Sequence, residues 1–564
     1  MIVPRKVPHS LRALLLALLA SAAPAGASGL IDNVNGLTVD ESGDLVHFTG
    51  LLIDSDGRVE KRLKRGDKRP DRPDFRYDGK GRTLIPGLID AHGDVMALGF
   101  ATLNLDLADT GSLDEAKAKI AAYAAANAGR PWIIGRGWDQ EAWGLGRFPT
   151  AADLAGLAGG RPIWLVAANG DAGWANDAAL IAGKITPASK APAGGRILMA
   201  GGKPGGVLVG TAMALMDAAL PRPQPKDYDA ALLKAQDMLL ARGVTAIADI
   251  GTSIEAWQAY RRAGDRGALR VRIMGYAAGM EQATLIAGPG PTPWLYDDRL
   301  RLGGVALTLD GGLRARAAWL KAAYADAPGD TGLPRLTAAQ LRNQMSRAAM
   351  DGFQLAVNAT GDRANAEVLD AIDELAETYK GDRRWRIDHA RIVNPADRPR
   401  FGHHGIRAVM APQQGAADRA MVTARLGPDR LDSADAWRAM LDEKALLAFG
   451  SSGPLAPAAP FAGIAAAITR PDEPAQRVKL SDGLRAYGWG AAHAGFAEQR
   501  FGNLAPGQRA DFLIVDRDIE LARPADLPAT RIVELWIGGQ RVLANVVAEP
   551  SGRAGEPDAI GPRN

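Results

Sequence analysis

Short apolar runs alternate with longer, Ala-rich amphipathic segments through most of the chain, and this alternation restricts the possible fold more than any other feature. Apolar runs of four or five residues indicate buried strands, and the amphipathic segments indicate helices. The apolar runs are residues 163–166, 245–249, 305–309, 353–357, 385–388, 406–410 and 446–449, and the helical patterns include 228–242 and 337–350. Strand–helix alternation is typical of an α/β fold with a parallel sheet, and this many units predicts a (β/α)8 barrel.

Both ends of the chain carry a different pattern, in which short alternating runs are separated by Gly and Asp. These runs are residues 36–39, 45–48, 50–54, 510–516 and 532–539. They predict β-strands with tight turns. We therefore expect 28–85 and 500–547 to form together one small β-sandwich domain. We expect 86–499 to be the barrel, with an insertion at about 100–225, and 548–564 to be a loose tail.

The first 27 residues have the features of a secretory leader. Arg5, Lys6 and Arg12 precede or begin an apolar stretch at 11–23, and small residues at 25–27 suit a signal peptidase. The sequence predicts a cleavable signal peptide at 1–27 and a periplasmic protein without a stable membrane anchor. An uncleaved N-terminal anchor is the alternative.

Charge and cysteine content exclude several classes of partner and chemistry. The formal charge is +3, and the leader holds three basic residues and no acid, so the rest of the chain is neutral overall. A neutral chain gives no reason to expect nucleic-acid binding. The chain has no cysteine, so disulfides and thiol chemistry are excluded. No oligomeric state is predicted.

An ordered set of short motifs covers nearly the whole chain after the leader. It begins with TLIPGLIDAH at 83–92 and ends with GNLAPGQRADF at 502–512; between them lie GWD at 137–139, NGDAGWAN at 169–176, GGRIL at 194–198, GVL at 206–208, DGGL at 310–313, GDRAN at 361–365, RIDHA at 386–390 and AFGSS at 448–452. In this order the motifs resemble the amidohydrolase superfamily, specifically the amidohydrolase-3 branch that contains N-substituted formamide deformylases.

The resemblance implies a barrel that holds one or two divalent ions, which activate water for attack on a carbon–nitrogen bond. In that family, strand one supplies His-x-His, strand four a lysine, strands five and six one His each, and strand eight an Asp that moves the proton. Imidazoles and carboxylates suit a zinc-like ion, which lowers the pKa of bound water to about 7.

This chain departs from the family pattern at most of those positions. His92 and His389 are kept, whereas the other positions fall on Asp94 (second His), Ala306 (lysine), Asn358 (strand-five His), Ser452 (general base) and Asp171 (a His of the inserted segment). Alanine has no donor atom, and an amide is a poor zinc ligand. We therefore predict a metal-free or catalytically impaired homologue without a cofactor, which keeps the pocket and binds a small amide-like molecule.

Two further interpretations stay open. His92, Asp94 and His389 would supply a two-His, one-carboxylate set for one zinc-like ion in an active amide or formamide hydrolase, with Asp171 as an unconventional base. A serine mechanism through Ser451 or Ser452 lacks the nucleophile-elbow motif.

Aromatic residues of the inserted segment allow two readings. Trp138 and Trp174 line the substrate pocket together with Asp171, or they pack the insertion.

Overall fold

The computed structural model describes residues 28–544 except 169, 171, 193–194, 315, 455 and 472, so the predicted leader and tail lie outside the described residues. Eight parallel strands form the predicted barrel sheet, and neighbouring strands in the following order are hydrogen-bonded: β6 (Leu88–Gly93), β13 (Val244–Thr252), β14 (Arg272–Ala278), β15 (Leu300–Thr308), β16 (Gln354–Ala359), β17 (Arg386–His389), β18 (Arg407–Met410) and β19 (Leu446–Phe449). The Ser452 amide donates to the His92 carbonyl at 2.9 Å, which brings β19 back to β6. The (β/α)8 prediction is confirmed.

The run at 163–166 is a strand, and it lies in the insertion predicted at about 100–225 and not in the barrel sheet. β14 was not predicted, because its polar first residue and Gly275 interrupt the apolar pattern. Strand pairing with β13 and β15 on either side overrides that weak local signal.

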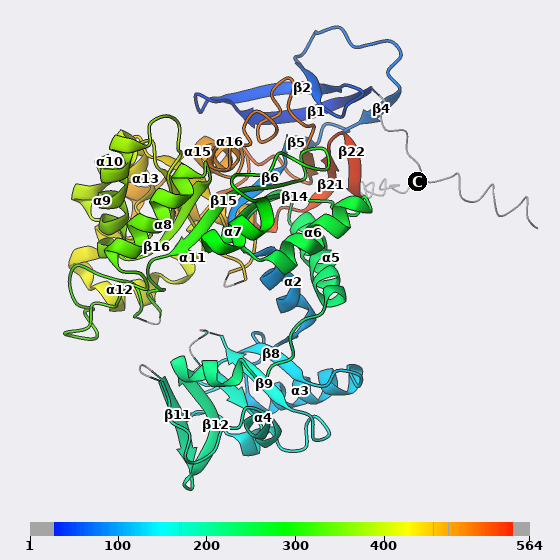
Figure 1. Cartoon of the computed structure of the whole chain (residues 1–564). Coiled ribbons are helices and arrows are strands. Elements are labelled where there is room, and N and C mark those ends of the chain that lie inside the picture. The colour runs from blue at the N-terminus through cyan, green and yellow to red at the C-terminus, as the bar shows by residue number, and fades with distance from the viewer. Residues whose placement is uncertain are drawn as a thin grey trace, which may run out of the picture.

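Helices pack around the barrel sheet and close its base (Figure 1). They are α5 (Pro225–Ala241), α6 (Ile254–Asp265), α7 (Gly279–Ala287), α8 (Ala338–Met350), α9 (Asp362–Thr378), α10 (Arg398–His403), α11 (Pro412–Ala417), α12 (Arg419–Leu426), α13 (Trp437–Asp442), α14 (Pro460–Thr469), α15 (Leu480–Ala486) and α16 (Trp489–Ala494). Small lumen side chains such as Ala91, Ala248 and Ala356 pack with Tyr276, and the base is filled by alanines of α16 together with Phe501. The lumen is thus a packed core that leaves chemistry to the strand ends.

Strands from both ends of the chain build the β domain. They are β1 (Gly29–Val39), β2 (Leu45–Ile53), β3 (Val59–Leu63), β4 (Phe75–Asp78), β5 (Thr83–Pro86), β20 (Phe512–Val515), β21 (Ile532–Ile537) and β22 (Gln540–Ala544). β20 pairs antiparallel with β5, which joins the two ends. β1 pairs first with β4 and, after a bulge, with β5. Trp536 stacks on Phe75 of β4 at 5.8 Å and on Phe512 at 5.4 Å, so the predicted sandwich is one continuous sheet folded onto itself.

The insertion forms a separate lobe that is joined to the barrel through α2 (Val95–Leu103) and α5 (Figure 1). Its sheet has the order β11-β12-β10-β9-β8-β7, and its elements are β7 (Leu105–Asp106), α3 (Leu113–Ala126), β8 (Ile133–Trp138), β9 (Ile163–Ala167), β10 (Ala172–Ala175), α4 (Asp177–Ala182), β11 (Gly195–Ala200) and β12 (Lys203–Gly210). A Cβ on Gly99 of α2 would lie 2.0 Å from the Ala231 carbonyl oxygen, so the close approach of α2 to α5 requires glycine. Among the described residues, no helix combines the length and hydrophobicity needed to cross a membrane.

Candidate functional site

The carboxyl ends of the barrel strands bring most of the predicted site residues to one mouth. His92 lies near the end of β6 and His389 ends β17, while Asn358 lies near the end of β16. Ala306 lies near the end of β15, and Ser452 follows β19. Asp171 lies outside the described residues.

A buried ion pair organises the centre of this mouth. The Arg386 guanidinium donates through Nε and Nη2 to the Asp388 carboxylate at 2.5 and 2.9 Å, and both side chains are 0% exposed. Arg386 also donates to the Ala91 carbonyl and lies over the Tyr276 ring at 4.7 Å. Burial raises the pKa of Asp388, but Arg386 and His92 outweigh burial and hold that pKa at about 2. The carboxylate is therefore charged at neutral pH.

His92 and His389 lie against each other beside this pair. The Nδ1 of His92 lies 2.7 Å from Asp388 Oδ2, and an ionised carboxylate only accepts, so Nδ1 carries the proton of that bond. The two imidazole centroids are 4.7 Å apart. Burial, and then the neighbouring His92, lower the pKa of His389 to about 3, so its ring is neutral. His389 has a φ of +71°, a left-handed conformation in which a non-glycine residue is strained.

Asp94 is engaged in local structure. Its carboxylate caps α2 by accepting from the Ala97 amide at 2.8 Å. Burial and the nearby Asp249 carboxyl raise its pKa. Asp249 in turn accepts from the Val95 amide at 2.8 Å and the Tyr260 hydroxyl at 2.9 Å. Asp249 was not predicted as a site residue, although it ends the apolar run at 245–249 and so marks the end of a buried strand.

Asp90 is a second buried carboxylate that was not predicted as a site residue. It accepts from the Ser451 amide at 2.9 Å and from the Ser451 hydroxyl at 2.5 Å, and also from the His92 amide at 3.1 Å. These bonds join β6 to the segment after β19. Because the Ser451 hydroxyl donates to Asp90, it is not paired with His389 as a serine nucleophile would be with its base.

Three of the replaced positions, Ala306, Asn358 and Ser452, supply few atoms that could bind a cation. Ala306 packs at the edge of the apolar lumen. The Asn358 Oδ1 atom is buried without a hydrogen-bond partner among the described residues. Ser452 is 5% exposed and has a φ of +59°.

Comparisons with known proteins identify the relationship. The model of the amidohydrolase family named Amidohydro_3 matches residues 77–543. The chain belongs to this amidohydrolase family. The protein LONG AFTER FAR-RED 3 of Arabidopsis thaliana is 30% identical over 489 residues, which cover 82% of each chain. The N-substituted formamide deformylase of Arthrobacter pascens is 25% identical, over 90% of this chain and 97% of its own.

Solved structures agree with the fold. An uncharacterized metal-dependent hydrolase from Pyrococcus furiosus superposes with a TM-score of 0.73 at 25% identity, covering 87% of this chain and 99% of that one. Its counterpart from Pyrococcus horikoshii gives a TM-score of 0.75 at 23% identity, over 88% and 99%. The resemblance predicted from the motifs is confirmed at the level of family and barrel.

The donor atoms at this amidohydrolase mouth do not fit a zinc centre. His92 is oriented by a carboxylate, as a metal-bound imidazole usually is, and His389 is neutral and adjacent. A catalytic zinc needs three protein ligands, however, and Asp94 is occupied as a helix cap while Ala306 contributes no donor. Among residues 28–544, with the masked positions set aside, no group of three or more His, Cys, Asp or Glu side chains is arranged to hold a metal ion.

The tryptophans predicted for the pocket lie inside the insertion. Trp138 and Trp174 are each 0% exposed in its core. The Trp138 indole donates to the Leu165 carbonyl and the Trp174 indole to the Thr150 carbonyl, both at 2.8 Å. Both side chains therefore pack in the core of the insertion.

Proposed function

We propose that this chain is a metal-free amidohydrolase homologue that binds a small amide-like molecule at the barrel mouth and does not hydrolyse it by metal-activated water. The single observation that carries this proposal is the state of the mouth around His92 and His389. Two imidazoles are present, but Ala306, Asn358 and Ser452 stand where a bridging lysine, a third imidazole and a proton-accepting carboxylate would be needed.

An amide-like ligand suits the polar atoms that the mouth does offer. Asn358 Oδ1 has no partner among the described residues and would accept a hydrogen bond from a ligand N–H group. The ring of His389, on the neighbouring strand β17, is neutral. A buried acceptor without a partner costs free energy, and a ligand N–H would remove that cost.

A second candidate function is an amide or formamide hydrolase with a rebuilt mononuclear site. The observation in its favour is the contact between His92 and Asp388, since second-sphere carboxylates commonly orient metal-bound imidazoles. This candidate needs a third ligand, so Asp94 would have to leave its capping position at Ala97.

Metal analysis of purified protein separates the two candidates. After incubation with zinc and removal of loosely bound ions, we expect less than about 0.1 equivalent of zinc, iron or manganese per chain. Stoichiometric metal that is lost in His92→Ala would overturn the metal-free proposal.

A restored variant provides the positive control. The triple change Asp94→His, Asn358→His and Ser452→Asp rebuilds three family donors. The left-handed backbone at Ser452 is one that Asp adopts readily. Zinc uptake by this variant and not by the wild type shows that the assay detects a competent site.

We also propose that the protein acts after export. The support is the basic, apolar and small-residue leader at 1–27, followed at once by β1, which begins at Gly29. Expression of the full chain in a bacterium should give a periplasmic product whose N-terminal residue is Ser28. A cytoplasmic product with an intact leader contradicts export.

A further inference from the structure

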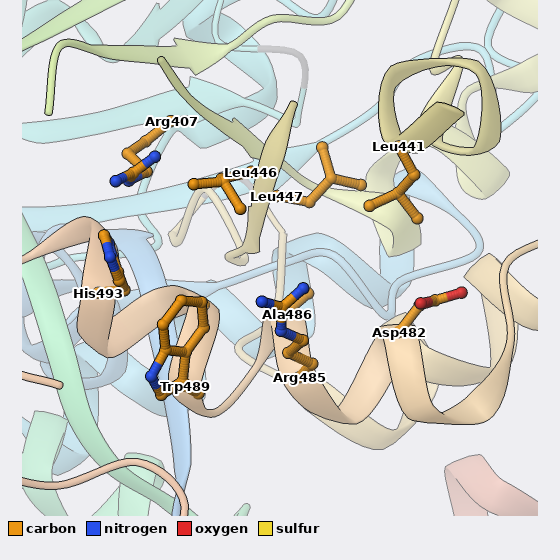
Figure 2. Close-up of a pocket in the computed structure, with 10 residues that line it drawn as sticks. Arg407, Leu441, Leu446, Leu447, Asp482, Arg485, Ala486, Trp489 and His493 are labelled. Atoms are coloured by element: carbon orange, nitrogen blue, oxygen red, sulfur yellow. The ribbon is translucent and has the colours of Figure 1, made fainter. Parts of the chain in front are cut away.

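The pocket at the base of the barrel is too small for an organic ligand. It lies between Arg407, Trp489 and His493, where β18 and β19 begin, and it encloses about 20 Å³ (Figure 2). That volume has room for about one water molecule. The polar atoms that could recognise an organic ligand are instead found at the mouth, at the opposite end of the barrel.

Asn358 and His92 each present an acceptor atom at the mouth. The Oδ1 atom of Asn358 is buried and has no partner among the described residues. His92 donates its Nδ1 proton to Asp388, so in the neutral imidazole the free lone pair lies on Nε2. Within the part of the chain that the structure describes, no residue donates to His92 Nε2, and the His92 side chain is 12% exposed. The mouth therefore carries two acceptors that lack donors.

The Asp388 carboxylate brings these two acceptors together. Asn358 of β16 is in register with Asp388 of β17, and register partners on neighbouring parallel strands point to the same face of the sheet. Asn358 also shares its face with Ala356, which packs in the lumen. Asp388 Oδ2 in turn lies 2.7 Å from His92 Nδ1. Asn358 and His92 thus flank one carboxylate, within reach of a single small ligand.

The carboxylates at the mouth already have partners, so the site does not select a cation. Asp388 is paired with Arg386 by two hydrogen bonds. Asp94 caps α2, and Asp90 accepts from the Ser451 hydroxyl. An ammonium group that entered the mouth would lose its hydrating water without gaining a free carboxylate. A neutral donor does not incur that cost.

Given the proposed binding of an amide-like molecule at the mouth, on which this inference rests, we propose that the molecule is a primary amide whose NH2 group donates one N–H to Asn358 Oδ1 and the other to His92 Nε2. A primary amide presents two N–H bonds on one nitrogen, a secondary amide one and a tertiary amide none. The His389 ring, centred 4.7 Å from that of His92, keeps one N–H in either neutral tautomer, which can donate to the amide carbonyl. The mouth therefore selects against substitution at the amide nitrogen.

The test is calorimetric titration of the purified protein with butyramide, N-methylbutyramide and N,N-dimethylbutyramide at about pH 8.5, where an ordinary imidazole is neutral. We expect one butyramide to bind per chain. Each methyl group on the nitrogen removes one hydrogen bond and leaves one acceptor unpaired, so each should weaken binding by about tenfold. Butylammonium chloride is the cationic analogue and should bind more weakly than butyramide.

Two variants of similar side-chain volume assign the acceptors. Asn358→Leu and His92→Phe each remove one acceptor, so each should weaken butyramide binding by about tenfold and make N-methylation less costly. The matched control is Asn127→Leu, which changes an asparagine at the end of α3 in the inserted lobe. This variant should bind butyramide as the wild type does.

The outcomes distinguish the ligand class from amide binding as such. Saturable binding of all three amides with equal affinity overturns the primary-amide assignment and leaves amide binding in place. Butyramide binding that neither Asn358→Leu nor His92→Phe weakens, or tighter binding of butylammonium, also overturns the assignment. Absence of saturable binding by every amide overturns both proposals. The comparison among the amides uses the wild-type chain, so it decides the matter if a variant fails to fold.

Discussion

Replacing Asp388 with Asn tests whether a buried ion pair organises the barrel mouth. Arg386 and Asp388 are both 0% exposed, and Arg386 Nη1 already has no partner within the described chain. Asn keeps the shape of the side chain but leaves the guanidinium without its counter-charge. Removing one partner of a buried pair costs about 3–5 kcal/mol, because the remaining charge stays desolvated.

The expected change in melting temperature follows from the size of the chain. Unfolding entropy is about 2.1 cal/mol/K per residue, or about 1 kcal/mol/K for one cooperative unit as long as the described chain. A loss of about 3–5 kcal/mol therefore lowers the melting temperature by about 3–5 °C in differential scanning calorimetry. The double variant Arg386→Met with Asp388→Leu removes both charges and should recover most of the loss.

The pair of Arg386 and Asp388 also predicts how the stability of the fold changes at low pH. The pKa of Asp388 is held at about 2 in the folded protein, below its ordinary value of 3.8. Its contribution to stability is therefore present above about pH 4 and is lost as the pH falls through about 2. An Asp388→Asn variant that stays within about 1 kcal/mol of the wild type at pH 7, or a double variant less stable than the single one, would refute this reasoning.

Three further predictions concern the rest of the molecule. Trp174→Phe removes the hydrogen bond to the Thr150 carbonyl and should cost about 1–2 kcal/mol of stability in urea unfolding, with ligand binding at the mouth unchanged. Asp310→Asn removes a carboxyl whose pKa burial raises to about 6; the stability of the wild type relative to this variant should fall by about 2–3 kcal/mol from pH 4 to pH 8, because the charged form is disfavoured in the fold. Asp511→Ala leaves Arg272 buried without its bidentate partner between the barrel and the β domain. It should lower the free energy of unfolding by about 3–5 kcal/mol. A loss smaller than about 1 kcal/mol would show that this contact does not hold the domains together.

The fold was largely predictable because its determinants are local and repeated. Apolar runs such as 245–249 and 353–357 became β13 and β16, and the helical pattern at 337–350 became α8. β14 was not predicted from the sequence, because this segment becomes a strand through pairing with its two neighbours, β13 and β15. Pairing is a tertiary property that a short, interrupted apolar pattern does not encode.

The candidate site was predictable in which residues it contains and not in what they do. Motif order alone predicted that Ala306, Asn358 and Ser452 lie at the ends of barrel strands, where the structure has them. It did not show that Asp94 caps α2 or that Asp388 is the partner of His92, because these contacts join side chains of different elements or depend on backbone conformation.

By itself, the sequence determined the barrel and its family, since both depend on residue type and order along the chain. Only the tertiary structure decided that Trp138 and Trp174 are core residues and that Arg386 and Asp388 form a buried pair beneath the two histidines. The physical reason is that burial and charge pairing depend on distances between residues far apart in the chain, which are fixed only once the strands have closed into a barrel.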